Sequence, residues 1–437
     1  MSTTTDLPRR KASGGALRPF LLRLHFYIGL FVGPFLFIAA LTGLLYVLTP
    51  QIEARLYSEA LFTDTVGPAQ PLSLQAQAAR DHIGGTLDVS AVRPAPAEGQ
   101  TTRIMFSDPA LGPSENRTLF VDPVTLAIKG DMTTYGTSGI LPFRITLDYL
   151  HRSLLLGDWG RYYSELAASW LWVVVLGGVA LWTTGAPRTA RRRIHGLIGV
   201  TAAVFLLFLS VTGLTWSQGA GGRIDALRGA IGWTTPSVST TLNGGEAMAM
   251  HHHHHAPDLA AREDRIDQLD DAARAAGLGS PFIEIRLPRP HEAWVVREYD
   301  RGWPTQAVTV ALAPDTLAIT DRADFADFTP VAKLIRWGID THMGVLFGLP
   351  NQILMATVAL ALMASTAWGY AIWWARRPAM GLPLAVLWMR LSLPLRVTTL
   401  LIACAFGWAL PTLGTSLAAF LVIDILRLTA TRRLALK

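Results

Sequence analysis

The sequence predicts a polytopic α-helical membrane protein with two extramembrane α+β modules and an internal, parallel duplication. Apolar residues make up 51% of the 437 residues and charged residues only 16%, whereas soluble chains carry about a quarter charged residues. Four uncharged runs each reach the roughly 20 residues that a membrane-spanning helix needs. Segments from the two halves of the chain also match at fixed offsets, which indicates a repeat.

The apolar runs predict four long spans and a terminal helical hairpin. The long runs are residues 26–48, 166–186, 196–222 and 343–375. A fifth region, residues 397–423, is uncharged for 27 residues but is interrupted around Pro411. It is long for one span and short for two, so we expect two short helices that turn near this proline.

Clusters of basic residues predict the orientation of the spans. They precede the first run, fill the loop between the second and third, follow the fourth and close the chain. The positive-inside rule places all of them, and therefore both termini, in the cytoplasm. This topology accounts for the pI of about 9.7 without a nucleic-acid partner. A cleaved signal peptide is the weaker interpretation, because the first apolar run is longer than the apolar region of a signal peptide, which usually has about 7–15 residues.

Two larger segments then lie on the outer face. In chain order the predicted parts are a cytoplasmic N-terminus (1–24), TM1 (25–48), outer module 1 (49–147), an interfacial segment with TM2 (148–186), a cytoplasmic loop (187–194), TM3 (195–222), outer module 2 (223–340), an interfacial segment with TM4 (341–375), a cytoplasmic loop (376–396), the hairpin TM5–TM6 (397–428) and a cytoplasmic tail (429–437).

Each outer segment shows the pattern of a small α+β module, in which a helix-like stretch precedes strand-like ones. The expected helices are 72–80 and 262–276, and the expected strands are 102–106, 118–128, 282–287, 293–297 and 307–311. Neither segment contains a catalytic triad, a P-loop or a dinucleotide fingerprint. The single cysteine excludes an internal disulfide framework, a cysteine-ligated iron–sulfur cluster and a C-x-x-C-H site for haem attachment.

Two offsets describe the repeat. A shift of 170 residues lays His25 on His195, and Thr42-Gly43-Leu44 on Thr212-Gly213-Leu214. A shift of 191 residues lays His151 on His342, Gly157 on Gly348, Gly178 on Gly369 and Trp182 on Trp373. Each repeat contains two crossings, so the repeats are parallel and an axis along the membrane normal would relate them.

This repeat places four histidines in two pairs, each at the edge of an apolar run. His25 and His195 open the first and third spans on the cytoplasmic side, and His151 and His342 precede the second and fourth on the outer side. Two facing imidazoles between helices fit a bis-histidine haem b, so we predict two such haems. Interfacial histidines that only hydrogen-bond a carbonyl or a headgroup are the alternative. Bare zinc fits less well, because it needs about four ligands.

Other polar features of the sequence also have ordinary explanations. Arg23, Arg152, Arg193 and Arg336 lie close in sequence to the histidines, where they could pair haem propionates, but interfacial charges explain them more simply. The run His251–His255 could bind copper, zinc or iron transiently. Low-complexity drift explains this run equally well, so it is not assigned to a site.

Three stretches resemble the PepSY-associated transmembrane family, which includes iron-regulated inner-membrane proteins and ferric-siderophore reductases of Gram-negative bacteria. They are Leu24-His25…Gly29…Gly33-Pro34…Leu41-Thr42-Gly43-Leu44, Val121-Asp122-Pro123-Val-Thr125 and Leu150-His151-Arg152-Ser-Leu-Leu-Leu-Gly157. The likeness extends to about residue 378. It implies PepSY-like outer modules in the periplasm, haems held by His25, His151, His195 and His342, and reduction of Fe(III) in siderophores.

The expected function is therefore that of a bacterial inner-membrane, multi-pass electron-transfer protein of the oxidoreductase class, surrounded by membrane lipid. Its acceptor would be a ferric siderophore or similar Fe(III) complex. Some relatives carry a cytoplasmic flavin reductase domain that this sequence lacks, so a separate flavin reductase or quinol would be the donor. The alternatives are a haem-free PepSY membrane protein that acts as a sensor or modulates a protease, and a transporter.

Overall fold

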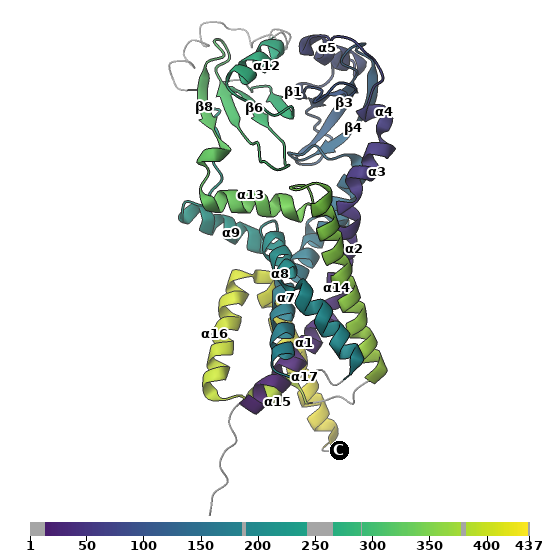
Figure 1. The fold of residues 1–437 in the computed structure, drawn as a ribbon. Coiled ribbons are helices and arrows are strands. Elements are labelled where there is room, and N and C mark those ends of the chain that lie inside the picture. Colours follow the sequence, from purple (N-terminus) through teal and green to yellow (C-terminus); the bar gives the residue numbers. More distant parts are fainter. Residues whose placement is uncertain (1–13, 186–188, 243–264, 290, 377–381, 436–437) are drawn as a thin grey trace, which may run out of the picture. The chain divides into compact units, whose positions relative to one another are not determined.

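The computed structural model describes residues 14–185, 189–242, 265–289, 291–376 and 382–435 (Figure 1). The chain forms two compact units. The helical unit comprises Met1–Leu45, Tyr149–Gly232 and Ile353–Lys437, and the sheet unit comprises Tyr46–Asp148 and Trp233–Gln352. Each unit is therefore built from distant parts of the sequence.

The sheet unit contains one antiparallel sheet of eight strands, in the order β4-β3-β2-β1-β5-β6-β7-β8 (Figure 1). Both outer segments of the sequence contribute four neighbouring strands. The strands are β1 (Val89–Arg93), β2 (Thr102–Phe106), β3 (Glu115–Val121), β4 (Ile128–Tyr135), β5 (Ile283–Arg286), β6 (Trp294–Glu298), β7 (Thr309–Leu312) and β8 (Ile319–Ala323).

One face of this sheet is apolar and is covered by the helices α5 (Leu72–His82) and α12 (Ile266–Ala275). Alternate strand residues point to this face, as the two-residue period of a strand requires. The central strand residues and the inner faces of both helices form one continuous core, which includes Ile104, Phe106, Leu119, Ile283, Ile285, Trp294, Val296, Leu269 and Ala76.

The sequence predicts two separate modules, but the structure joins them into one sheet. Strand β1 pairs with β5 in antiparallel fashion, with Ala91 opposite Arg286 and Val92 opposite Ile285. An unpaired edge strand exposes a row of backbone donors and acceptors. The pairing of β1 with β5 provides hydrogen-bond partners for the backbone of both strands, which would be exposed sheet edges if the modules were separate.

The β3–β4 and β7–β8 turns have the same backbone form. Leu126 and Leu317, which are 191 residues apart, both have positive φ angles of 64° and 55°. Their amides donate to the carbonyls of Asp122 and Ala313, respectively. In the first turn the Asp122 side chain also accepts bonds from the hydroxyls of Thr63 and Thr65. The repeat offset found in the sequence therefore extends to local backbone geometry.

Short helices α3 (Thr49–Leu56) and α4 (Ser58–Leu61) also belong to the sheet unit, as do the 3₁₀ turn Phe325–Asp327 and the helix α13 (Pro330–His342). The helices of the helical unit, some of which cross its boundary, are α1 (Gly14–Phe31), α2 (Gly33–Val47), α6 (Pro142–Ser153), α7 (Gly157–Thr183), α8 (Ala190–Leu214), α9 (Gly219–Ala230), α14 (Leu349–Arg376), α15 (Leu384–Met389), α16 (Leu393–Ala409) and α17 (Pro411–Ala435).

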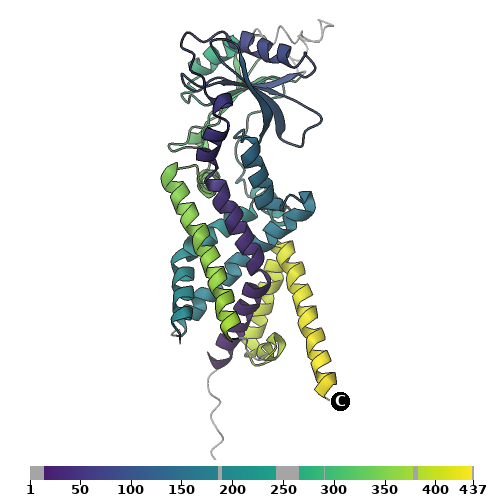
Figure 2. The ribbon, with the colours of Figure 1, turned by 90° about the vertical axis from the view of Figure 1, so that its right-hand side faces the viewer.

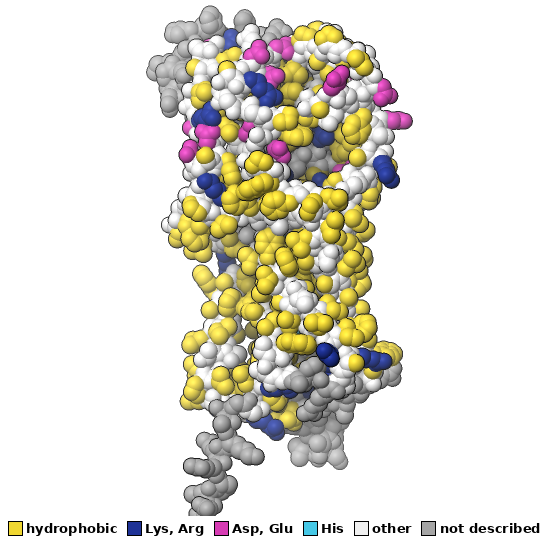
Figure 3. Space-filling view, in the orientation of Figure 1, with side chains coloured by type: hydrophobic (Ala, Val, Ile, Leu, Met, Phe, Trp, Pro, Cys, Tyr) yellow, Lys and Arg dark blue, Asp and Glu magenta, His cyan; other side chains and the backbone are white. Residues whose placement is uncertain are grey.

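Three of the described helices, α7, α8 and α14, are long and apolar enough to cross a membrane, and α1 with α2 makes a fourth if the bent pair is one span. Their visible surface is mostly hydrophobic in Figure 3, whereas acidic side chains appear on the sheet unit. Six spans were predicted from the sequence. Helix α16, at 17 residues, covers roughly 25 Å and is short for a bilayer core of about 30 Å.

The first predicted span is not one continuous helix. Helices α1 and α2 meet at Val32 with a bend of 56°. Pro34 explains the break, because proline lacks an amide donor and its ring clashes with the carbonyl four residues earlier. That carbonyl belongs to Leu30, and it accepts a bond of 2.6 Å from the Tyr370 hydroxyl. Gly33 lets Tyr370 of α14 approach closely, and both views show α14 beside α2 (Figures 1 and 2).

Helices α16 and α17 turn at Leu410, next to the proline where the sequence predicts a hairpin. The helices approach closely at Gly407 and Gly414, where an added Cβ on Gly414 would overlap the Gly407 backbone. Small residues permit such close helix contacts in membranes. Asp424 of α17 is buried and accepts a bond from the Ala385 amide at the start of α15.

Candidate functional site

The helical unit brings His25 and His195 together. His25 lies in α1 and His195 lies near the start of α8. Their ring centroids are 6.1 Å apart, and the ring planes make an angle of 77°. The two residues are 170 positions apart in the sequence, so only the fold places them side by side. The pairing predicted from the repeat is thus present as a contact.

Each of these rings is fixed by a carbonyl from a neighbouring helix. The Nδ1 atom of His25 lies 3.0 Å from the Val174 carbonyl of α7, and that of His195 lies 3.0 Å from the Ser365 carbonyl of α14. A carbonyl can only accept, so both Nδ1 atoms carry the proton. Both Nε2 atoms are then the unprotonated nitrogens that can bind a metal. Val174 and Ser365 differ by 191 residues, the second repeat offset.

Glycines shape the space around both rings. A Cβ added to Gly178 would lie 3.2 Å from Cε1 of His25, and one added to Gly369 would lie 3.5 Å from Cε1 of His195. These glycines are also 191 residues apart. One turn beyond each histidine, an added Cβ on Gly29 or Gly199 would meet nothing within 4 Å. The helices therefore leave room beside both imidazoles.

The pair matches the donor set of a bis-histidine haem. Metal–imidazole bonds are about 2 Å long, so two nitrogens on one metal lie about 4 Å apart, and the 6.1 Å between the ring centroids is compatible with that spacing. Ligating histidines commonly donate their second ring N–H to a backbone carbonyl, as both rings do here. Among the residues that the structure describes, no three or more His, Cys, Asp or Glu side chains form a group that could hold a metal ion by themselves.

His151 lies in the last turn of α6 and has an analogous arrangement. Its Nδ1 atom lies 2.9 Å from the Thr42 hydroxyl. That hydroxyl donates to the Ile38 carbonyl at 2.8 Å, so its lone pair accepts the Nδ1–H and leaves Nε2 unprotonated. A Cβ on Gly43 would lie 3.3 Å from His151 Cε1. Tyr163 of α7 donates its hydroxyl to the His151 carbonyl at 2.8 Å.

His342 is the last residue of α13 and belongs to the sheet unit. Its helix is held by the buried carboxylate of Asp340, which accepts bonds from Arg301 at 2.7 Å and from Arg336 at 2.6 Å. The same Arg301 donates to the Thr137 hydroxyl, in the loop before α6. The pairing of His151 with His342 stays a prediction.

Two of the arginines considered as propionate partners have other partners in the structure. Arg336 is bound to Asp340, and Arg23 donates to the Leu382 carbonyl at 3.0 and 2.9 Å. Both guanidinium groups are therefore engaged by protein atoms, and the interfacial role expected for these arginines stays a prediction. The run His251–His255 lies outside the described residues.

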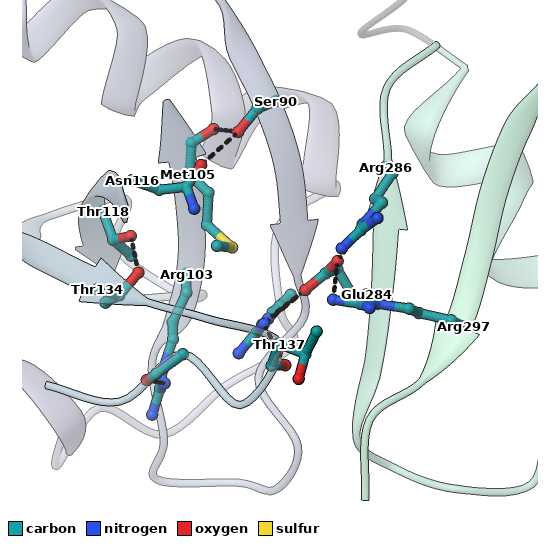
Figure 4. Close-up of polar contacts among 12 residues, drawn as sticks. Ser90, Arg103, Met105, Asn116, Thr118, Thr134, Thr137, Glu284, Arg286 and Arg297 are labelled. Atoms are coloured by element: carbon teal, nitrogen blue, oxygen red, sulfur yellow. Dashed lines mark hydrogen bonds and ion pairs between the residues drawn. The ribbon is translucent and has the colours of Figure 1, made fainter. Parts of the chain in front are cut away.

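The sheet face opposite the apolar core carries a cluster of charges that crosses the β1–β5 seam. Glu284 of β5 accepts bonds from Arg93 of β1 at 2.5 Å, from Arg286 at 2.6 Å and from Arg297 of β6 at 2.7 Å. Figure 4 shows Glu284 between Arg286 and Arg297. Burial alone would raise the pKa of Glu284, but the nearby Arg93, Arg297 and Arg286 lower it to about 2.

Sequence reasoning found the histidines but not the groups that orient them. Thr42 was noticed only as a matched repeat position, and the carbonyls of Val174 and Ser365 were not considered. Once one of these carbonyls is known, the repeat identifies the other, because Val174 and Ser365, whose carbonyls accept from the rings, are related by the same 191-residue shift as His151 and His342.

Comparison with known families gives one result for most of the chain. The model described as PepSY-associated TM region matches residues 22–376. This range contains all four histidines, the whole sheet unit and the helices up to α14. It leaves out α15, α16 and α17. No curated protein matches the chain.

Proposed function

The chain belongs to the PepSY-associated TM region family, and from this premise we propose that it is a di-haem b electron-transfer protein of the bacterial inner membrane. It reduces ferric siderophores or other Fe(III) complexes at the periplasmic side. The observation that supports this proposal best is the contact of His25 with His195, with centroids 6.1 Å apart and both Nδ1 atoms bound to carbonyls.

These residues fit the group that the proposal requires. His25 and His195 would hold one haem, and the Val174 and Ser365 carbonyls would keep the rings in the metal-binding tautomer. Gly29 and Gly199, which have open space beside them, would leave room for a flat ring between helices. Haem b with two histidine ligands supplies reversible one-electron chemistry when bound.

His151 and His342 would hold the second haem. His151 has the same tautomer as the first pair because Thr42 accepts its Nδ1–H. Asp340, which two arginines hold, fixes the end of the helix that carries His342. The matching turns, glycines and ring partners at offsets of 170 and 191 residues support an internal duplication, in which each repeat supplies one histidine to each pair.

The proposed topology keeps both termini in the cytoplasm and the sheet unit in the periplasm. It rests on the positive-inside rule. Electrons would come from a separate flavin reductase or from quinol. One electron converts Fe(III) to Fe(II), and hard oxygen ligands hold Fe(II) far less tightly, so the reduction itself releases the iron. The protein needs no nucleophile for this step. Its role is to bind two redox groups and to shield them from water.

Absorption spectroscopy of the purified full chain in detergent tests the proposal. Dithionite should produce the Soret and α bands of a six-coordinate b-type haem, and substitution of either member of the first pair should remove part of them. A folded preparation without such bands, whose histidine variants behave as the wild type, would overturn the proposal and favour the haem-free sensor or protease modulator. Fe(III) reduction by the reconstituted protein in liposomes would then separate a reductase from a transporter.

A further inference from the structure

A cavity of about 200 Å³ lies in the sheet unit, apart from the histidines. It is bounded by α3, by the strand β2 and by the loop that leads into α6. Its charged lining residues are Glu53, Arg103 and Arg144, and Ser138 and Gly139 contribute polar backbone and side-chain atoms. Nothing in the electron-transfer function described above uses this cavity.

The two arginines that line the cavity carry more positive charge than the single carboxylate of Glu53 can neutralise. Arg103 donates to the Gly139 carbonyl at 3.2 Å and lies over the Phe120 ring, and neither it nor Arg144 forms an ion pair within the described part of the chain. Glu53 accepts a bond from the backbone amide of Arg144 at 2.9 Å rather than from a guanidinium. Two cations therefore face one anion.

Arg144 has an unused edge. The residue is only 9% exposed, and its Nε and Nη2 atoms are buried without a hydrogen-bond partner. These two nitrogens form the side of the guanidinium that makes paired, parallel bonds to a carboxylate. Elsewhere in this unit the same two nitrogens of an arginine bind a carboxylate. The Nε and Nη2 atoms of Arg117 donate to Asp131, and those of Arg322 donate to Asp324. A buried donor left unpaired costs free energy, which a suitable ligand would recover.

We propose that this cavity binds a carboxylate group, held by the Nε–Nη2 edge of Arg144 and by the charge of Arg103. The volume is below the roughly 300 Å³ at which pockets for drug-sized ligands begin, so the occupant is a small organic acid or one carboxylate arm of a larger molecule. The arm could belong to a propionate of a bound haem, which has the same chemistry. Because both nitrogens are shielded from water and the guanidinium lies over the Tyr46 ring at 4.8 Å, binding requires the Arg144 side chain to rotate towards the cavity.

Calorimetric titration of the full chain in detergent with citrate, and with uncharged glycerol as a control probe, tests this proposal. Citrate should bind and glycerol should not. Arg144→Lys retains the charge but loses the paired edge, and should weaken citrate binding roughly tenfold or more. Arg103→Lys should weaken it less. Arg117→Lys is the matched control, because it alters the same kind of edge on the exposed pair with Asp131, and it should leave citrate binding unchanged.

Two preparations distinguish the sources of the carboxylate. If a free organic acid is the ligand, citrate binds to the haem-free and the haem-containing protein alike. If a haem propionate is the ligand, citrate binds only to the haem-free protein. Absence of citrate binding in both, or equal affinity in the wild type, Arg144→Lys and Arg103→Lys with unchanged thermal midpoints, would overturn the proposal. If the chain binds no haem, citrate titration of the haem-free protein still tests the carboxylate site. The test of this site and the test of the electron-transfer function can therefore fail separately.

Discussion

The imidazole rings of His25 and His195 lie 6.1 Å apart, and each donates its Nδ1–H to a carbonyl on a different neighbouring helix. Four helices, α1, α7, α8 and α14, therefore position one pair of nitrogens. Each ring depends on a backbone atom that no side-chain substitution at the carbonyl residue removes. This arrangement leaves the Nε2 atom of each ring unprotonated, which the proposed function requires because one iron would bind both rings.

Removal of either ring should abolish the same haem. We expect His25→Ala and His195→Ala each to lower the haem-to-protein ratio to about half, because two axial ligands act on one iron. The double variant should lose no more than either single variant. The pyridine haemochrome assay of purified protein measures the ratio. A double variant with markedly less haem than both single variants would show that the two histidines belong to different sites.

Gly178 should accommodate a side chain poorly, because an added Cβ would lie 3.2 Å from Cε1 of His25 and the ring would have to move to admit it. We expect Gly178→Val to displace the ring and to lower haem content or shift the Soret maximum. The adjacent Gly177 is the control, since its Cβ would lie 3.9 Å from the His25 ring, an ordinary contact. Gly177→Ala should retain the wild-type spectrum, and equal spectra for both variants would contradict the tight fit.

Thr42 should affect the haem affinity and the reduction potential of the site to which His151 belongs. Thr42→Val removes the acceptor for the Nδ1–H of His151, whereas Thr42→Ser retains it. Loss of such a partner typically lowers metal affinity about 10–100-fold, so we expect the valine variant to bind one haem more weakly and to change its reduction potential. Redox titration followed by absorption measures both effects. Serine should restore the wild-type values, and a normal potential in the valine variant would refute the orienting role.

Glu284 should stabilise the seam of the sheet in a pH-dependent way. Its pKa in the folded chain, about 2, lies below the ordinary value of 4.5. A carboxyl group with a lowered pKa contributes stability that is present above its unfolded pKa and is lost as the pH falls towards the folded value. Glu284→Gln should therefore destabilise the protein by about 3–5 kcal/mol at neutral pH, and the difference from the wild type should shrink as the pH approaches 2.

Denaturant unfolding of the full chain in detergent, followed by the fluorescence of its 14 tryptophans, measures this effect. Asp131→Asn is the control, because Asp131 forms a partly exposed pair with Arg117 that should contribute only about 0–1 kcal/mol. The role assigned to Glu284 would be wrong if the two variants unfolded at the same denaturant concentration.

Local features of the fold followed well from the sequence. The predicted strand 102–106 coincides with β2, and the predicted helix 72–80 lies within α5. Strands β1 (Val89–Arg93), β4 (Ile128–Tyr135) and β8 (Ile319–Ala323) were not predicted, because each mixes apolar residues with polar or charged ones. The break at Val32 was also not predicted. An apolar run does not show whether a proline inside it will bend the helix, because this depends on tertiary contacts such as the bond from Tyr370 to the Leu30 carbonyl.

The sequence by itself determined which segments are apolar enough for a membrane and which histidines occupy equivalent places in two repeats, because hydropathy and repeat offsets are properties of the linear chain. Only the tertiary structure decided that both outer segments share one sheet through β1 and β5, and that the Val174 and Ser365 carbonyls select the tautomer of His25 and His195. The physical reason is separation along the chain. These bonds join residues 149 and 170 positions apart, and a backbone carbonyl has no residue-specific signal that would identify it in advance.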